Sequence, residues 1–365
     1  MGEGATVSAP GAEARNADQP FVLLISDRPA ERAALERAIA LVMDCRAVEP
    51  GAVLPTARPR LVILDVPPDR TVAFDSVVGT SAWPVPVLIL VRGGPSPLTG
   101  AHVRQLPATT PRQTVLANAF AMIEDAARSS ETRKRRLVEH VTGATAIVAE
   151  LFDSAALGAG LRRSDIDQGT ELVLAAVSEV GIGAWLEAVW RYDIGVYQHT
   201  LGVAGHAATF GSQIGLSRSD LNRLVRAALL HDIGKSRIPV EILNKPGPLT
   251  PEEFRLMQRH PDIGASLLAA QGEFESEVID VVRHHHERLD GRGYPDRLAG
   301  SAINDLVRIV SICDVFSALT ERRTYRKPAS GPEAMAIMVE AKGHLDPDLL
   351  RAFAPVMLRN DTLAA

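Results

Sequence analysis

The chain has 365 residues, of which 46% are hydrophobic and 23% charged, and its formal net charge is -5. This length favours two or three domains, and the composition is ordinary for a water-soluble globular protein. The negative charge excludes a globally basic protein that binds nucleic acid polymers, but it does not exclude a small anionic substrate.

The sequence predicts a cytoplasmic protein without membrane contact. The first residues lack a basic start and an apolar stretch, so we expect no secretory signal and interpret residues 1–19 as a flexible tail. The aliphatic run 85–91 is far shorter than the roughly 18 residues of a membrane span. Cys45 and Cys313 lie in apolar contexts without paired spacing, which is typical of a reducing compartment.

Apolar runs of strand length alternate with helical patterns in the first third of the chain. The predicted strands are 21–25, 61–64 and 85–91. The predicted helices are 29–40 and 112–127. Continuous apolar strands are typical of a parallel sheet covered on both faces. These patterns predict a doubly wound α/β domain over residues 20–127.

Acidic residues follow two of these strands. Asp27 and Asp65 lie at the sheet edge where open parallel sheets bind ligands, so together they could hold a divalent cation. The segment resembles a response-regulator receiver domain of two-component signalling, with Asp65 in the place of the phosphoacceptor. It departs from that family at Ser26, at Val91 in place of the switch Ser or Thr, and at Thr110 in place of the Lys. Two interpretations stay open: a phosphorylated receiver, or a pseudo-receiver whose surface mediates dimerisation or partner docking.

Residues 128–183 are predicted to be a helical connector. Apolar residues recur at spacings of three and four from Leu137 to Leu151, which predicts an amphipathic helix, and a second helix is expected over 168–180. Such a segment relays between domains or forms the seam of a homodimer. The basic cluster 133–136 is interpreted as a solvated face.

The last part of the chain is predominantly helical, and its helix ends carry histidine and aspartate. Ser219 is predicted to cap a helix that delivers His231 and Asp232 at its end. A capping box at Thr250 starts a helix that runs to His260.

Two further predicted helices carry similar side chains. The helix that begins at Ser276 exposes His285 and His286 at its end. Residues 303–319 form an apolar helix interrupted by Asp314, whose ionised carboxylate would be costly to bury without a partner such as a metal ion.

Together these side chains predict a two-metal centre. Adjacent residues on a helix point about 100° apart, so the pairs His231-Asp232 and His285-His286 each serve two ions or bridge them. The candidate metal ligands are His199, His231, Asp232, His260, His285, His286 and Asp314.

Residues 184–358 resemble an HD-GYP domain, a subclass of the HD-superfamily phosphohydrolases. The matching blocks are His231-Asp232-Ile233-Gly234-Lys235, His260-Pro261-Asp262-Ile263-Gly264, His285-His286-Glu287 continuing to Gly293-Tyr294-Pro295, and Asp314 to Thr320 continuing to Arg323-Thr324-Tyr325-Arg326. The resemblance implies an all-α domain and a metal-dependent phosphodiesterase with iron or manganese. Its substrate would be cyclic di-GMP, hydrolysed to pGpG, GMP or both by a hydroxide that bridges the metal ions, in bacterial second-messenger signalling.

The seven candidate ligands fall on the ligand positions of that family. As catalytic residues we expect Asp232, which orients the attacking hydroxide, and Lys235, which reaches a phosphate oxygen. The resemblance places Arg323 and Arg326 against the second phosphate or the guanine edges. Tyr294 would stack in the substrate pocket or have only a structural role in its loop.

Two departures from the family bear on the metal centre. Some members carry a third-metal Glu where this chain has Gly195, so we expect two divalent ions. Ser317 stands where the family usually has Asp. Two other functions stay open: a hydrolase of another cyclic or linear dinucleotide, or a weakly active module that responds to cyclic di-GMP. In the second case the loop 293–295 and the receiver-like domain would bind protein partners.

Overall fold

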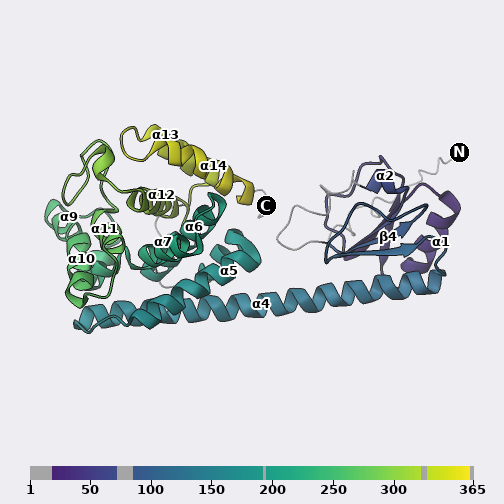
Figure 1. Cartoon of the computed structure of the whole chain (residues 1–365), viewed down its shortest axis with the longest axis horizontal. Coiled ribbons are helices and arrows are strands. Elements are labelled where there is room, and N and C mark those ends of the chain that lie inside the picture. Colours follow the sequence, from purple (N-terminus) through teal and green to yellow (C-terminus); the bar gives the residue numbers. More distant parts are fainter. Residues whose placement is uncertain (1–18, 72–84, 192–194, 322–326, 362–365) are drawn as a thin grey trace, which may run out of the picture. The chain divides into compact units, whose positions relative to one another are not determined.

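The computed structural model describes residues 19–71, 85–191, 195–321 and 327–361 (Figure 1). The chain divides into two compact units, Met1–Thr132 and Arg133–Ala365. The expected tail lies outside the described residues up to residue 18.

The N-terminal unit contains a five-stranded, wholly parallel sheet with the strand order β2-β1-β3-β4-β5. The strands are β1 (Phe21–Ser26), β2 (Asp44–Val48), β3 (Leu61–Asp65), β4 (Val87–Val91) and β5 (Val103–Pro107). The three central strands are the predicted ones, and the α/β class is confirmed. Strands β2 and β5 were not predicted; they are half-exposed edge strands that carry polar residues such as Arg46 and Gln105. Continuous apolar runs are typical only of strands that are buried on both faces, so these edge strands lack that pattern.

Hydrophobic side chains cover both faces of this sheet. On one face, α1 (Pro29–Ala40) and the first part of α4 (Arg112–Leu157) contribute Leu35, Ile39 and Val115 to a shared core. The opposite face forms a second core that includes Leu98. A short helix, α2 (Pro68–Thr71), follows β3.

The C-terminal unit is helical. Its helices after α4 are α5 (Arg163–Val189), α6 (Gly195–Gln213), α7 (Arg218–Leu230), α8 (Val240–Leu243), α9 (Pro251–Met257), α10 (His260–Gln271), α11 (Ser276–His284), α12 (Asp305–Thr320), α13 (Gly331–Glu340) and α14 (Pro347–Asp361), with 3-10 turns at Ile233–Arg237 and Gly300–Ala302. The later part of α4 and the whole of α5 join the core of this unit, through residues such as Val148 and Val173. The segment 128–183, expected to be a connector, therefore contributes to that core.

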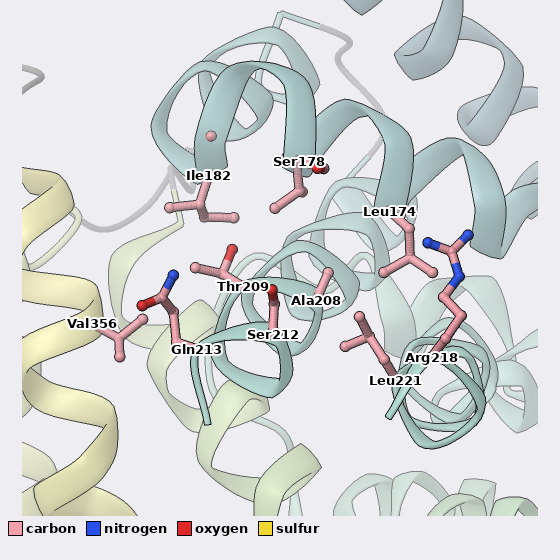
Figure 2. A pocket seen from close by; sticks show the side chains of 12 residues that line it. Leu174, Ser178, Ile182, Ala208, Thr209, Ser212, Gln213, Arg218, Leu221 and Val356 are labelled. Atoms are coloured by element: carbon pink, nitrogen blue, oxygen red, sulfur yellow. The ribbon is translucent and has the colours of Figure 1, made fainter. Parts of the chain in front are cut away.

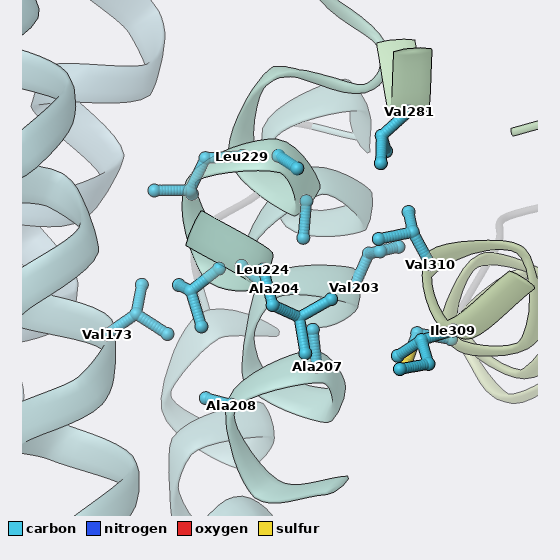
Figure 3. Packing of buried hydrophobic residues seen from close by; sticks show 14 of the residues in the cluster. Val173, Val203, Ala204, Ala207, Ala208, Leu224, Leu229, Val281, Ile309 and Val310 are labelled. Atoms are coloured by element: carbon cyan, nitrogen blue, oxygen red, sulfur yellow. The ribbon is translucent and has the colours of Figure 1, made fainter. Parts of the chain in front are cut away.

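Helix α6 lies at the centre of this core and packs against α5, α7 and α12 (Figure 3). Val203, Ala204 and Ala207 of α6 face the large aliphatic side chains of its neighbours. Small residues on α6 let it pack closely against α5, because a Cβ on Gly205 would lie 2.6 Å from the ring of Trp185. The same indole donates a hydrogen bond of 3.1 Å to the backbone oxygen of Leu201. The start of α6, which carries His199, is thereby fixed against α5.

Two expectations about helices in this unit were wrong. The side chain of Ser217, not that of Ser219, caps α7 by accepting a hydrogen bond from the backbone of Asp220. Helix α5 is long and apolar enough to span a membrane by length and composition, whereas we expected no such segment. Its Val173 and Trp185 are buried in the core of the unit.

A cavity of about 510 Å³ opens between α5, α6 and α7, beside Val356 of α14 (Figure 2). It lies where α5 is interrupted by the non-helical Gly181, with φ of 80° and ψ of 165°. Its lining combines apolar side chains such as Ile182 with polar ones such as Gln213. None of the lining residues is a candidate metal ligand, so this cavity is separate from the metal centre.

Candidate metal centre

The structure brings all seven candidate ligands together in two groups, although they come from segments up to 115 residues apart in the sequence. Within each group the ligand atoms lie within 4.8 Å of one another. The first group is Asp232, His260, His285 and His286, and the second is His199, His231 and Asp314.

Two glycines bring the first group together. A Cβ on Gly234 would lie 1.9 Å from the backbone oxygen of His260 and 2.7 Å from the backbone nitrogen of Gly264. A Cβ on Gly264 would in turn lie 2.8 Å from Val282 of α11. Only glycine lets the turn that follows α7 pack so closely against α10. This close packing places Asp232 next to His260.

Backbone carbonyl groups fix the orientation of three histidines. Nδ1 of His231 lies 2.6 Å from the oxygen of Ala228, and Nδ1 of His260 lies 2.7 Å from the oxygen of Met257. Nδ1 of His285 lies 3.0 Å from a carbonyl oxygen of α11 in the same way. Because a carbonyl only accepts hydrogen bonds, each Nδ1 carries the proton, and each Nε2 has a free lone pair for a metal ion.

The carboxylate of Asp232 lies between the two groups. Its Oδ1 is 3.2 Å from Nε2 of His260, and its Oδ2 is 3.3 Å from Nε2 of His231 and 3.8 Å from Nε2 of His199. Lys235 donates a hydrogen bond of 2.6 Å to Oδ2. Burial alone would raise the pKa of Asp232, but the charges of Lys235 and His231 outweigh it and hold the pKa well below its usual value. Asp232 would therefore be placed to share its carboxylate between metal ions held by the two groups.

Unsatisfied polar atoms in this cluster fit a metal ion. Nε2 of His231 and Oδ1 of Asp232 are buried and have no hydrogen-bond partner among the described residues. Nε2 of His260 and Nε2 of His285 lie only 3.2 Å apart. Burial lowers the pKa of His286 to about 3, so its imidazole is neutral and able to coordinate. Mixed imidazole and carboxylate ligation suits Fe, Mn or Zn.

Residues 186–349 match the family model described as HD domain. The HD domain is a family of metal-dependent hydrolases, and this match includes all seven residues of the cluster.

Curated relatives match the same region. Over 157 residues the chain is 43% identical to a cyclic di-GMP phosphodiesterase of Pseudomonas aeruginosa, a match that covers 43% of this chain and 38% of that protein. Over 143 residues it is 43% identical to a 3'3'-cGAMP-specific phosphodiesterase of Vibrio cholerae, covering 39% of this chain and 33% of that protein. The chain thus spans less than half the length of these relatives.

A solved structure shares the fold. An HDG"Y"P protein of Bdellovibrio bacteriovorus superposes with a TM-score of 0.50 at 17% sequence identity, over 64% of this chain and 80% of that chain.

Tyr294, which lies in the region that matches the HD family model, is beside the cluster. Its ring stacks on that of His286, with the ring centroids 4.8 Å apart. Burial raises the pKa of Tyr294, which keeps the phenol neutral. Gly293 permits the tight loop, because a Cβ there would lie 2.5 Å from the backbone of Glu287, whose side chain accepts a hydrogen bond from the backbone of Asp296.

The predicted substrate-binding residues are only partly within the described structure. Lys235 and Tyr294 both lie at the cluster. Arg323 and Arg326 lie outside the described residues.

Glu321, which lies in the region that matches the HD family model, is a contact of the site that the sequence did not predict. Its Oε2 accepts a hydrogen bond of 2.9 Å from Nδ1 of His199, whose Nε2 lies 2.9 Å from Oδ1 of Asp314. Burial alone would lower the pKa of His199, but these two carboxylates raise it to about 9. The available signal was spacing, since Glu321 follows Asp314 by seven residues, or two helical turns.

In the N-terminal unit, arginines pair with the acidic residues. Asp65 is fully buried, and Arg28 donates two hydrogen bonds of 2.9 Å, one to each of its carboxylate oxygens. Ser26 donates a third, of 2.8 Å. Arg92 links Asp65 to Asp27, because it donates to the backbone oxygen of the first and the side chain of the second. Guanidinium groups thus lie where we expected a divalent cation.

Proposed function

We propose that this protein is a metal-dependent phosphodiesterase that hydrolyses cyclic di-GMP to pGpG, GMP or both, in bacterial second-messenger signalling. One observation carries the proposal: a single buried carboxylate, that of Asp232, lies between two groups of histidine and aspartate ligands. The match of this region to a relative named cyclic di-GMP phosphodiesterase supports the choice of substrate.

The seven ligands would hold two divalent ions, iron or manganese, and Gly195 leaves a third ion without its expected carboxylate. When bound, such ions lower the pKa of a water molecule and stabilise negative charge on a reacting phosphodiester.

The side chains around the ligands have separate roles in this proposal. Asp232 stays ionised and orients the nucleophilic water toward the phosphorus atom. Lys235, whose side chain is 22% exposed, turns its ammonium group from Asp232 to a nonbridging phosphate oxygen. Tyr294 forms an aromatic wall beside His286 against which a guanine base stacks. Arg323 and Arg326 are proposed to contact the second phosphate or a guanine edge.

The N-terminal unit is proposed to be a receiver-like module. Its strand order β2-β1-β3-β4-β5 is that of flavodoxin-like, doubly wound sheets, the class that includes receivers. Of the two interpretations of Asp65, the buried pair with Arg28 favours a pseudo-receiver, because a phosphoryl group would have to displace the guanidinium. We propose that the protein works in the cytoplasm as a homodimer, with partners at the receiver-like unit and at the loop 293–295.

The first test is hydrolysis of cyclic di-GMP by anaerobically purified protein, with bound metal quantified in the same sample. We expect turnover and about two ions per chain, and loss of turnover in Asp232→Ala. Fully metallated protein that hydrolyses no cyclic dinucleotide would overturn the proposal. Signalling output that survives in Asp232→Ala would favour a binding module instead.

A second candidate substrate is a mixed cyclic dinucleotide. The 43% identity to a 3'3'-cGAMP-specific phosphodiesterase favours it. Comparison of kcat/KM for cyclic di-GMP, 3'3'-cGAMP and linear pGpG on the same preparation decides between them.

A further inference from the structure

His199 is oriented differently from the other histidines of the metal centre. His231, His260 and His285 each donate from Nδ1 to a carbonyl oxygen of their own or a preceding helical turn. His199 donates from Nδ1 to a side chain, the carboxylate of Glu321, which directly follows α12 and is only 13% exposed.

This contact acts on the coordinating atom. A carboxylate that accepts the Nδ1 proton fixes the ring plane and the tautomer, and it makes Nε2 a stronger electron donor. Nε2 of His199 points into the second ligand group, 2.9 Å from Asp314 and 3.8 Å from Asp232. Glu321 itself lies on the opposite side of the imidazole from these ligands.

We propose that Glu321 is a positioning residue for the second metal site. It holds His199 as the Nδ1-protonated tautomer, with Nε2 free to coordinate an ion that His231 and Asp314 would also hold. The first site depends on its own backbone contacts and does not require Glu321. This inference rests on the proposed metal-dependent function and adds a residue outside the candidate ligand set.

The chain offers a matched control between the same two helices. Nδ1 of His206 lies 2.8 Å from Oγ of Ser317, one turn before Glu321 on α12. His206 belongs to neither ligand group, and burial lowers its pKa to about 3. Ser317→Ala therefore removes a buried contact between α6 and α12 without touching a ligand.

The experiment measures Mn²⁺ binding to the metal-stripped full chain by equilibrium dialysis. We expect two ions per wild-type chain and per Ser317→Ala chain. In Glu321→Ala, affinity at one site should fall about 10- to 100-fold while the other is unchanged. Glu321→Gln, whose amide oxygen still accepts from Nδ1, should recover part of the loss.

A thermodynamic cycle locates the effect. In a His231→Ala background, which already lacks the second site, Glu321→Ala should leave the remaining site unchanged. Wild-type Mn²⁺ affinity at both sites of Glu321→Ala would overturn the inference. Equal weakening of both sites in Glu321→Ala and in Ser317→Ala would also overturn it, because it would indicate a packing role. A wild-type chain that binds no Mn²⁺ would instead overturn the proposed function, and the inference with it.

Discussion

Nζ of Lys235 donates a hydrogen bond of 2.6 Å to Oδ2 of Asp232. Asp232 precedes the 3-10 turn Ile233–Arg237 that follows α7, and Lys235 lies within it, so the ammonium group compensates a carboxylate that is buried among imidazoles. Displacement of this contact by a phosphate oxygen would transfer the positive charge to the reacting group.

Lys235→Met should lower kcat for cyclic di-GMP by about 10²- to 10³-fold, because a preorganised donor to the phosphate is lost. Bound metal should stay near the wild-type amount, since Lys235 is not a ligand. Turnover and metal content are measured on one preparation, with Lys245→Met as the control, a lysine that pairs with Glu253 away from the cluster. Unchanged kcat would remove Lys235 from the mechanism.

Gly234→Ala should disrupt the centre sterically. The new Cβ would lie 1.9 Å from the backbone oxygen of His260, and a backbone atom cannot move aside as easily as the end of a flexible side chain. We expect a loss of about 3 kcal/mol or more in unfolding free energy, together with impaired metal binding. Gly183→Ala, at a helix position with no atom within 4 Å, is the control and should be neutral or slightly stabilising. Equal urea midpoints for the two variants would contradict the predicted clash.

Acid should destabilise the metal-stripped C-terminal unit through His206. Burial lowers its pKa to about 3 from 6.5, so below pH 6.5 the unfolded chain binds a proton that the folded chain does not. The stability is present above pH 6.5 and is lost toward pH 3, at about 1.4 kcal/mol per pH unit for one group. Urea unfolding of wild type and His206→Leu at pH 7 and pH 5 checks this prediction. If the unfolding free energy depends equally steeply on pH in both proteins, the acid destabilisation comes from other groups.

Arg28→Ala should leave the buried carboxylate of Asp65 short of its bidentate partner and destabilise the N-terminal unit by about 1–3 kcal/mol. Asp65→Asn in the same chain should remove most of that penalty, which a double-mutant cycle measures. Wild type incubated with acetyl phosphate and Mg²⁺ should show no phosphoryl adduct by mass spectrometry. A stoichiometric adduct on Asp65 would restore the phosphorylated-receiver interpretation.

Chelation should lower the thermal stability of the C-terminal unit only. A metal ion whose free concentration is 100 times its dissociation constant stabilises the folded state by about 2.7 kcal/mol. Differential scanning calorimetry with and without chelator should therefore shift one transition and leave that of the N-terminal unit in place. A shift of both transitions would place metal in both units.

The sequence predicted the parts of the structure that depend on local pattern. His231 and Asp232 lie at the end of an amphipathic helix, and the central strands β1, β3 and β4 are continuous apolar runs. Contacts made by tertiary packing gave no such pattern. Arg28 meets Asp65 across 37 residues, so this pair does not follow from periodicity. Glu321 follows Asp314 by two helical turns, but that spacing does not identify its partner His199, which is 122 residues away.

The bridging position of Asp232 has an electrostatic consequence. Asp232 lies between the two groups, and the only carboxylates among the seven candidate ligands are those of Asp232 and Asp314. Two divalent ions would therefore leave the metal-loaded centre with an excess of positive charge. Such a centre attracts a doubly anionic nucleotide from a distance, so association should slow as ionic strength rises, whatever the shape of the surrounding pocket.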